Sequence, residues 1–333
     1  MGDVEYAVPP TLGIFVGLVL AQVPAFKPVA GFMVVGMQCM MSVRAKGSLK
    51  ERLKTLLYVI LILTGTIGWG IVSTMHSFTM FFGVILLTLA LTYWRHFFPD
   101  DWRNINTPSA ALFFLTLATK PTTLFPVEAV FLSGFLGIAL QAVLWWLWPS
   151  AYETQSALVR LKSQRARNRK CRMDFSLVTN VKPELWKYGM RLGLLLLLSS
   201  FLAHVSGRLH SYWIALTVII VLQDSHADTL KRTTDRILGT FVGCLIGSAL
   251  LVLHPLPELT IPLLVVCMFT FLLLVRNYYP VACVFLTIYI ILLIGHQFAN
   301  TFTVALERAG FTLAGGLLVV MSSYILFWKR TKA

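Results

Sequence analysis

The chain has 333 residues, of which 57% are apolar and only 13% are charged. Soluble globular domains carry about 25% charged residues, so this composition excludes an ordinary soluble domain and predicts lipid as the solvent. The net charge is +14, but most of the basic residues lie in short segments between apolar runs. Positive charge in such segments orients a membrane protein. Because there is no zinc-finger spacing and no basic helix with a heptad repeat, we expect no nucleic-acid partner.

The apolar runs predict twelve membrane spans, since a spanning helix needs about 20 mostly apolar residues. In chain order, the first six are 9–25, 29–43, 55–73, 78–94, 109–124 and 126–148. Six more follow at 189–205, 211–223, 237–254, 260–275, 279–296 and 301–327. The expected fold is therefore an all-α polytopic membrane protein of about 12 transmembrane helices. Its expected parts are a six-helix repeat at 1–150, a basic cytoplasmic linker at 151–188, and a second six-helix repeat at 189–333.

Charge also predicts the orientation of these spans. If the N-terminus is cytoplasmic, most lysines and arginines fall on the inner side, so both termini are expected there. The N-terminus lacks the basic start of a secretory signal, and we expect its first apolar run to be retained as a helix. The linker has seven basic residues between Arg160 and Arg172. We interpret it as a connector that touches anionic lipid headgroups, with a regulatory or partner-binding role as the alternative.

The two halves resemble each other in sequence. Residues 93–99, YWRHFFP, align with 274–280, LVRNYYP, and residues 111–116, ALFFLT, align with 282–287, ACVFLT. Because each half has an even number of spans, the repeats are predicted to run parallel, about an axis along the membrane normal. The second span of each half is short, at 29–43 and at 211–223. Short spans at corresponding positions of two halves indicate a substrate route.

The most distinctive stretch runs from Tyr212 to Gly247. A Tyr-Trp pair and a Leu-Thr pair are followed by spaced arginines and by Arg-x-x-Gly-Thr-x-x-Gly. This pattern resembles the fusaric acid resistance and aromatic acid exporter family. The matching positions are Tyr212, Trp213, Leu216, Thr217, Thr229, Arg232, Arg236, Gly239, Thr240 and Gly243. The segment from Arg308 to Gly316 is also similar to an Arg-to-Gly helix of that family.

The resemblance implies a bacterial inner-membrane exporter of small aromatic or other weak organic acids. It also implies, as a partner, a periplasmic membrane-fusion protein of an efflux pump. Plant malate transporters are similar in plan, which keeps an anion channel as an alternative. The chain departs from larger members because it lacks a sizeable cytoplasmic domain. Its first half also has Lys54-Thr55-Leu56-Leu57 in place of the arginine motif.

Basic and aromatic residues of this stretch suggest how an organic anion is held. Arg232 and Arg236 are four residues apart and so share a helix face near the cytoplasmic mouth. An aromatic carboxylate needs a fixed cation and an aromatic wall. The predicted substrate-binding residues are Tyr212, Trp213, Thr217, Arg232, Arg236 and Arg308. The alternative is that these arginines anchor the helix at the membrane surface, with Asp228 or Asp235 as ion-pair partners.

Charges inside a span need a strong reason, and the last span holds Glu307 beside Arg308. We predict Glu307, together with Asp235, as proton-coupling carboxylates, since burial favours the protonated form of a carboxyl group. A structural ion pair with another helix is the alternative for Glu307. Three glycines at spacings of four share one helix face and predict a packing seam. They are Gly239, Gly243 and Gly247.

The sequence therefore predicts proton-coupled export of small organic anions, with lipid around the chain and a homo-oligomer as the expected assembly. An anion channel and a membrane-embedded transferase remain as alternatives. There is no Gly-x-Ser-x-Gly, no His-Glu-x-x-His and no phosphate-binding Gly-rich loop, so we expect no enzyme. The five cysteines show no paired spacing, so no disulfide framework, metal or cofactor is expected.

Overall fold

A computed structural model describes residues 2–43, 49–97, 102–147, 183–223, 225–253, 257–295 and 301–327. In these ranges the chain is helical and contains no strand. The first half contains α1 (Gly2–Leu20), η1 (Pro24–Val29), α2 (Ala30–Ser42), α3 (Leu49–Ser73), α4 (Ser77–Phe97), α5 (Trp102–Thr119) and α6 (Phe125–Leu147). The second half contains α10 (Pro183–Ser206), η2 (Leu209–Tyr212), α11 (Trp213–Val221), α12 (His226–Val252), α13 (Pro257–Leu274), α14 (Tyr279–Gly295) and α15 (Thr301–Phe327). Of the predicted linker at 151–188, residues 151–182 lie outside the described ranges.

Two helix boundaries differ from the predicted spans in a way that matters for function. α12 begins at His226 rather than at 237, because the Ser225 hydroxyl caps it by accepting the Asp228 backbone N–H at 3.0 Å. Arg232 and Arg236 therefore lie inside α12, in agreement with the helix face predicted from their spacing. The span predicted at 211–223 is divided into the 3-10 helix η2 and the nine-residue helix α11.

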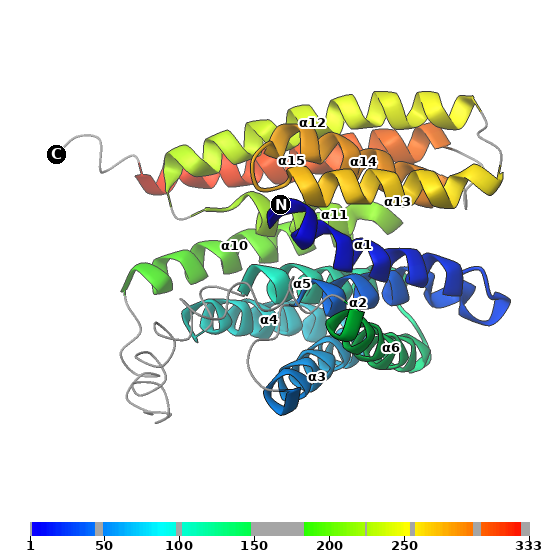
Figure 1. The fold of residues 1–333 in the computed structure, drawn as a ribbon. Helices are drawn as coiled ribbons and strands as arrows, with labels where there is room; N and C mark the ends of the chain where they lie inside the picture. Colours follow the sequence, from blue (N-terminus) through cyan, green and yellow to red (C-terminus); the bar gives the residue numbers. More distant parts are fainter. Residues whose placement is uncertain are drawn as a thin grey trace.

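The helices are arranged in two outer layers with a thin layer between them (Figure 1). Helices α12 to α15, drawn yellow to red, form one outer layer, and α2 to α6, drawn blue to dark green, form the other. Helices α1, α10 and α11 lie between the two. In this middle layer, α1 packs against α2 and α13, α10 packs against α4 and α11, and α11 packs against α15 and α5.

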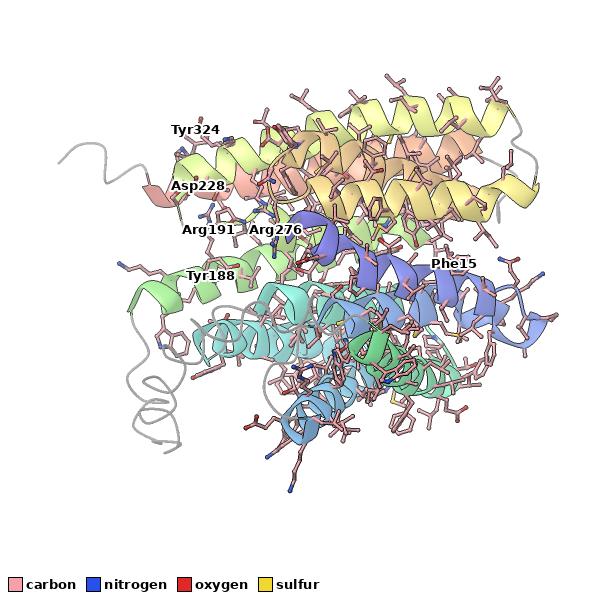
Figure 2. The ribbon with its side chains drawn as sticks, viewed as in Figure 1. Phe15, Tyr188, Arg191, Asp228, Arg276 and Tyr324 are labelled. Atoms are coloured by element: carbon pink, nitrogen blue, oxygen red, sulfur yellow. The ribbon has the colours of Figure 1, made fainter. Side chains whose placement is uncertain are left out.

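The outer faces of both layers are apolar, and their side chains project away from the molecule (Figure 2). Leu245 on α12, for example, is 74% exposed, and Leu61 on α3 is 61% exposed. Within the described ranges, five helices are long and apolar enough to cross a membrane: Leu49–Ser73, Phe125–Leu147, Trp186–Ser206, His226–Val252 and Phe302–Ile325. Shorter apolar helices accompany them at Val4–Leu20, Ser77–Tyr93, Ile105–Thr119, Leu209–Val221, Leu259–Leu274 and Tyr279–Ile294. The fold is therefore that of an all-helical, multi-pass membrane protein.

The closest packing in the second half joins α12 to α14. A methyl group on Gly239 would lie 2.5 Å from the Pro280 carbonyl oxygen, and one on Gly243 would lie 2.6 Å from Thr287 Cβ. At Gly247 the corresponding distance, to Ile291 Cβ, is 3.2 Å. Small residues of this kind let two helix backbones approach closely in lipid. The approach brings Arg236 on α12 against the first turns of α14.

Candidate functional site

Arg236 is a buried cation between α12 and α14. Only 2% of the surface of Arg236 is exposed. Its Nη1 atom lies 3.6 Å from Cys283 Sγ, which is a weak acceptor, and its Nε–H group has no hydrogen-bond partner. Tyr279 lies next to this guanidinium. The guanidinium of Arg232 lies over the ring of the same tyrosine, with 4.4 Å between Arg232 Cζ and the ring centroid. Arg236 therefore has neighbours but no opposite charge to balance it.

Arg308 on α15 is the second buried cation, at 3% exposure. Its guanidinium lies over the Trp213 ring, with 4.7 Å between Cζ and the ring centroid, and its Nε–H group also lacks a partner. The charges of Arg308 and Arg236 are close enough to repel each other. Among the residues that the structure describes, no carboxylate oxygen lies within 4.0 Å of either guanidinium.

A third buried arginine shows what a satisfied guanidinium looks like in this fold. Arg191 on α10 is 6% exposed, and its Nε atom donates to Ser322 Oγ at 3.1 Å. One Nη atom of Arg191 donates to Ser323 Oγ and to the Val319 carbonyl oxygen. Taking an ion out of water costs several kcal/mol unless an opposite charge or hydrogen bonds compensate it. Arg191 has such bonds to oxygen atoms of α15, whereas among the described residues Arg236 has only the weak bond to Cys283 Sγ and Arg308 has no hydrogen bond.

Aromatic rings form one side of the cationic cluster, which consists of Arg236 and Arg308. Trp213, at the start of α11, is 2% exposed, and Tyr212 lies tilted against it with 5.7 Å between ring centroids. Helix η2 fixes the position of Trp213, whose backbone N–H donates to the carbonyl oxygens of His210 and Ser211. A cation over an aromatic face in a desolvated place gains about 2 kcal/mol. The ring therefore supports Arg308 without neutralising its charge.

Thr217, a predicted substrate-binding residue, has a different environment. Its hydroxyl donates to the Trp213 carbonyl oxygen at 2.8 Å, within α11. A methyl group on Gly315 would lie 2.9 Å from Thr217 Cβ, so this threonine packs α11 against α15. Asp235 is half-buried on α12. In the described part of the chain, neither Asp228 nor Asp235 forms an ion pair with Arg232 or Arg236, and the Asp228 carboxylate instead accepts the Ser225 hydroxyl at 2.6 Å.

Glu307 lies at the edge of the cluster and is paired. Its two carboxylate oxygens lie 2.8 Å from Arg208 Nη1 and 2.7 Å from His210 Nδ1. The His210 ring in turn stacks on Trp213, with centroids 4.7 Å apart and an angle of 10° between the planes. Sequence reasoning did not find Arg208, His210 or Cys283 as neighbours of the site, because these contacts join residues of different helices.

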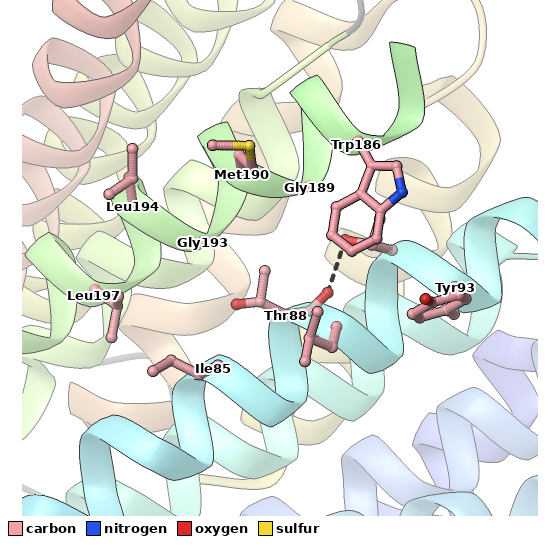
Figure 3. Close-up of a pocket in the computed structure, with 11 residues that line it drawn as sticks. Ile85, Thr88, Tyr93, Trp186, Gly189, Met190, Gly193, Leu194 and Leu197 are labelled. Carbon is pink, nitrogen blue, oxygen red and sulfur yellow. Dashed lines mark hydrogen bonds between the residues drawn. The ribbon is translucent and has the colours of Figure 1, made fainter. Parts of the chain in front are cut away.

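An apolar groove runs between α4 and α10 (Figure 3). Its volume is about 280 Å³, and its walls are Ile85, Thr88, Leu89, Thr92, Tyr93, Trp186, Gly189, Met190, Gly193, Leu194 and Leu197. The hydroxyl of Thr92 donates its hydrogen to the Thr88 carbonyl oxygen at 2.7 Å, so this side chain has no hydrogen-bond donor left for a ligand in the groove. None of the described residues that line the groove is charged or belongs to the arginine cluster, so these residues offer no counter-charge to an anion.

Comparison with known proteins finds relatives of part of this chain. The inner membrane protein YccS of Escherichia coli is 34% identical over 131 residues, which are 39% of this chain and 18% of the relative. An uncharacterized protein of Synechocystis, slr1298, is 32% identical over 109 residues, 33% of this chain and 14% of the relative. An uncharacterized protein of Haemophilus influenzae is 28% identical over 134 residues, 40% of this chain and 19% of the relative. The chain thus spans less than a fifth of the length of these relatives, and no solved structure matches it.

A family model identifies the matched region. Residues 197–322 match the model described as fusaric acid resistance protein-like, which confirms the resemblance predicted from the motif at 212–247 and from the segment at 308–316. Arg236, Arg308 and Trp213 all lie within this region, whereas Arg191 lies just before it. Residues 197–322 of this multi-pass membrane protein are thus similar to the family of fusaric acid resistance protein-like proteins.

Proposed function

We propose that this protein exports small organic acids, aromatic acids among them, across the inner membrane of a bacterium. The observation that carries the proposal is the pair of buried guanidinium groups, Arg236 and Arg308, with no carboxylate near them in the described ranges. Each buried ion costs several kcal/mol, and an organic anion is the ligand that offsets this cost. One relative, YccS of Escherichia coli, is named an inner membrane protein, which supports the proposed location in the inner membrane.

The proposal includes an architecture of about 12 spans in two parallel six-helix repeats, with both termini in the cytoplasm. Equivalent contacts in the two halves support it. The first helix of each half packs on the fourth helix of the other half, as α1 does on α13 and α10 on α4. Helices α3 and α5 pack together as α12 and α14 do, and α2 packs on α6 as α11 does on α15.

Each part of the cluster has a role in this proposal. Arg236 and Arg308 bind the carboxylate, and the Trp213 ring supports Arg308. Both guanidiniums are buried, so the anion reaches them after the surrounding helices part, as in alternating access. Glu307 and Asp235 are the carboxylates proposed for proton coupling. A periplasmic membrane-fusion protein and further copies of this chain are the proposed partners.

Transport by purified protein in lipid vesicles tests the proposal. Radiolabelled benzoate uptake is measured with and without a pH gradient, for the wild type and for Arg236→Gln and Arg308→Gln. Each charged hydrogen-bonded contact contributes about 1.5–3 kcal/mol, so each substitution is expected to lower uptake about tenfold or more. Arg276→Gln is the matched control, because Arg276 is exposed and lies over the Tyr6 ring at 3.8 Å.

The control is expected to transport as the wild type does. Equal uptake by all four proteins would refute the role of the buried arginines. Uptake that never exceeds the equilibrium level under a pH gradient, yet depends on Arg236 and Arg308, would instead support the anion channel.

A further inference from the structure

The cationic cluster of Arg236 and Arg308 has two buried positive charges to balance, on the helices α12 and α15, which pack together, while the neighbouring Arg232 is only half-buried. Arg236 is 2% exposed and Arg308 is 3% exposed, and their charges act on each other. A ligand with a single negative charge would leave one net positive charge in surroundings of low dielectric constant, where charge is costly. A ligand with two negative charges would leave none. Charge balance therefore favours a dianion.

The unsatisfied donors are also arranged as two similar sets. Arg236 and Thr240 are four residues apart on α12, and Arg308 and Thr312 are four residues apart on α15, so each pair shares one face of its helix. The Nε–H groups of both arginines and the hydroxyls of both threonines are buried without a hydrogen-bond partner.

The two hydroxyls are unusual among the buried threonines of these helices. Thr233 on α12 donates to the carbonyl oxygen of Thr229 at 2.7 Å, and Thr287 on α14 donates to that of Cys283 at 2.8 Å. Thr240 and Thr312 make no such bond. A buried polar group without a partner costs about as much as a lost hydrogen bond, which points to a ligand as the missing partner.

We infer that the pairs Arg236–Thr240 and Arg308–Thr312 are the two ends of a binding site for a small dicarboxylate, with the Trp213 ring holding Arg308 in place. Each guanidinium presents a planar fork of donors that fits one carboxylate, and each threonine adds one hydroxyl donor. Two such ends select a molecule with two ionised carboxylates. The inference rests on the proposed function and narrows its substrate to planar organic dianions.

Binding measurements on the purified protein in detergent test the inference. Titration calorimetry at pH 7 compares benzoate, with one carboxylate, and isophthalate, with two carboxylates on the same ring. The second carboxylate gains its own guanidinium, so isophthalate is expected to bind about tenfold to a hundredfold more tightly. In Arg308→Gln this preference is expected to disappear, because one charge is removed from the site. The control Arg276→Gln is expected to keep the preference.

Variants that preserve side-chain shape guard against misfolding. Thr240→Val and Thr312→Val remove one hydroxyl each and are expected to weaken isophthalate binding about fivefold while leaving benzoate binding less changed. The inference is overturned if the wild type binds benzoate as tightly as isophthalate, or if Arg308→Gln and Arg236→Gln both keep the dianion preference. If wild-type protein binds and transports benzoate alone, the proposed function stands and the dianion assignment fails. If neither acid binds or crosses, both fail.

Discussion

The glycine seam between α12 and α14 gives a stability prediction that needs no assumption about function. Gly239, Gly243 and Gly247 lie against α14 at graded distances, and an added methyl group would meet its nearest atom at 2.5, 2.6 and 3.2 Å, respectively. Gly310 on α15 has nothing within 4 Å of such a methyl group. The same change, glycine to alanine, therefore produces a clash at two positions, a tight contact at one and open space at the last.

The magnitudes follow from two opposing effects. Alanine is favoured over glycine inside a helix by about 1 kcal/mol, so Gly310→Ala is expected to stabilise the protein by about 0.5–1 kcal/mol. At Gly239 the methyl group would press on the backbone carbonyl of Pro280, which cannot rotate away as the end of a flexible side chain does. Overpacking costs about 1–3 kcal/mol, so Gly239→Ala and Gly243→Ala are expected to be destabilising by about 1–2 kcal/mol net, with Gly247→Ala near neutral.

Thermal unfolding in detergent, followed with a thiol-reactive fluorophore, measures this series. The reporter suits the protein because the thiols of Cys39, Cys244, Cys267 and Cys283 are buried in the folded state and form no disulfide among the described residues. One kcal/mol corresponds to about 2–4 °C in the melting temperature of a domain of moderate size. The expected order of melting temperatures is Gly310→Ala highest, Gly247→Ala next, and Gly243→Ala and Gly239→Ala lowest. If Gly239→Ala melted at or above the wild-type temperature, the close approach of α12 to α14 would be wrong.

Two further predictions concern the edge of the cluster. Glu307→Gln removes the negative partner of Arg208 and His210. We expect this change to lower the pH-driven uptake of the organic anion into vesicles about tenfold. Undiminished uptake would exclude a coupling role for Glu307. Trp213→Leu removes the ring under Arg308, worth about 2 kcal/mol in a desolvated place. Calorimetry is expected to show weaker binding of isophthalate, because Arg308 loses the ring that supports it, and an unchanged affinity would rule out this support.

Features that depend on residues near one another in the chain were predictable from the sequence. The apolar periodicity predicted most helices, and the span at 301–327 has the same bounds as α15. The spacing of four residues placed Arg232 and Arg236 on one helix face. Even the early start of α12 had a local signal, because Ser225 followed three residues later by Asp228 is a capping pattern.

Contacts between helices were not predictable, because composition and spacing fix the faces of a helix but not its neighbours. Nothing near Trp213 in the sequence indicates that Arg308 lies over its ring. The partners of Glu307 are about a hundred residues away in the chain, and Arg208 and His210 resemble any polar residues of a loop. The division of the span at 211–223 also had no local signal. The apolar run begins at Tyr212, the last residue of η2, and passes into α11 at Trp213 without a break.

The neighbouring residues Glu307 and Arg308 connect the edge of the protein with its interior. Successive residues on an α-helix point about 100° apart, so one side chain faces η2 while the other faces the bundle. Glu307 is accordingly paired with His210, and Arg308 lies over Trp213, the residue on which His210 stacks. Loss of the Glu307 ion pairs would free η2 and, with it, the start of α11 that carries Trp213. A change in the charge of Glu307 is thereby transmitted to Arg308 through the Trp213 ring, because α15 holds Glu307 and Arg308 in a fixed relation.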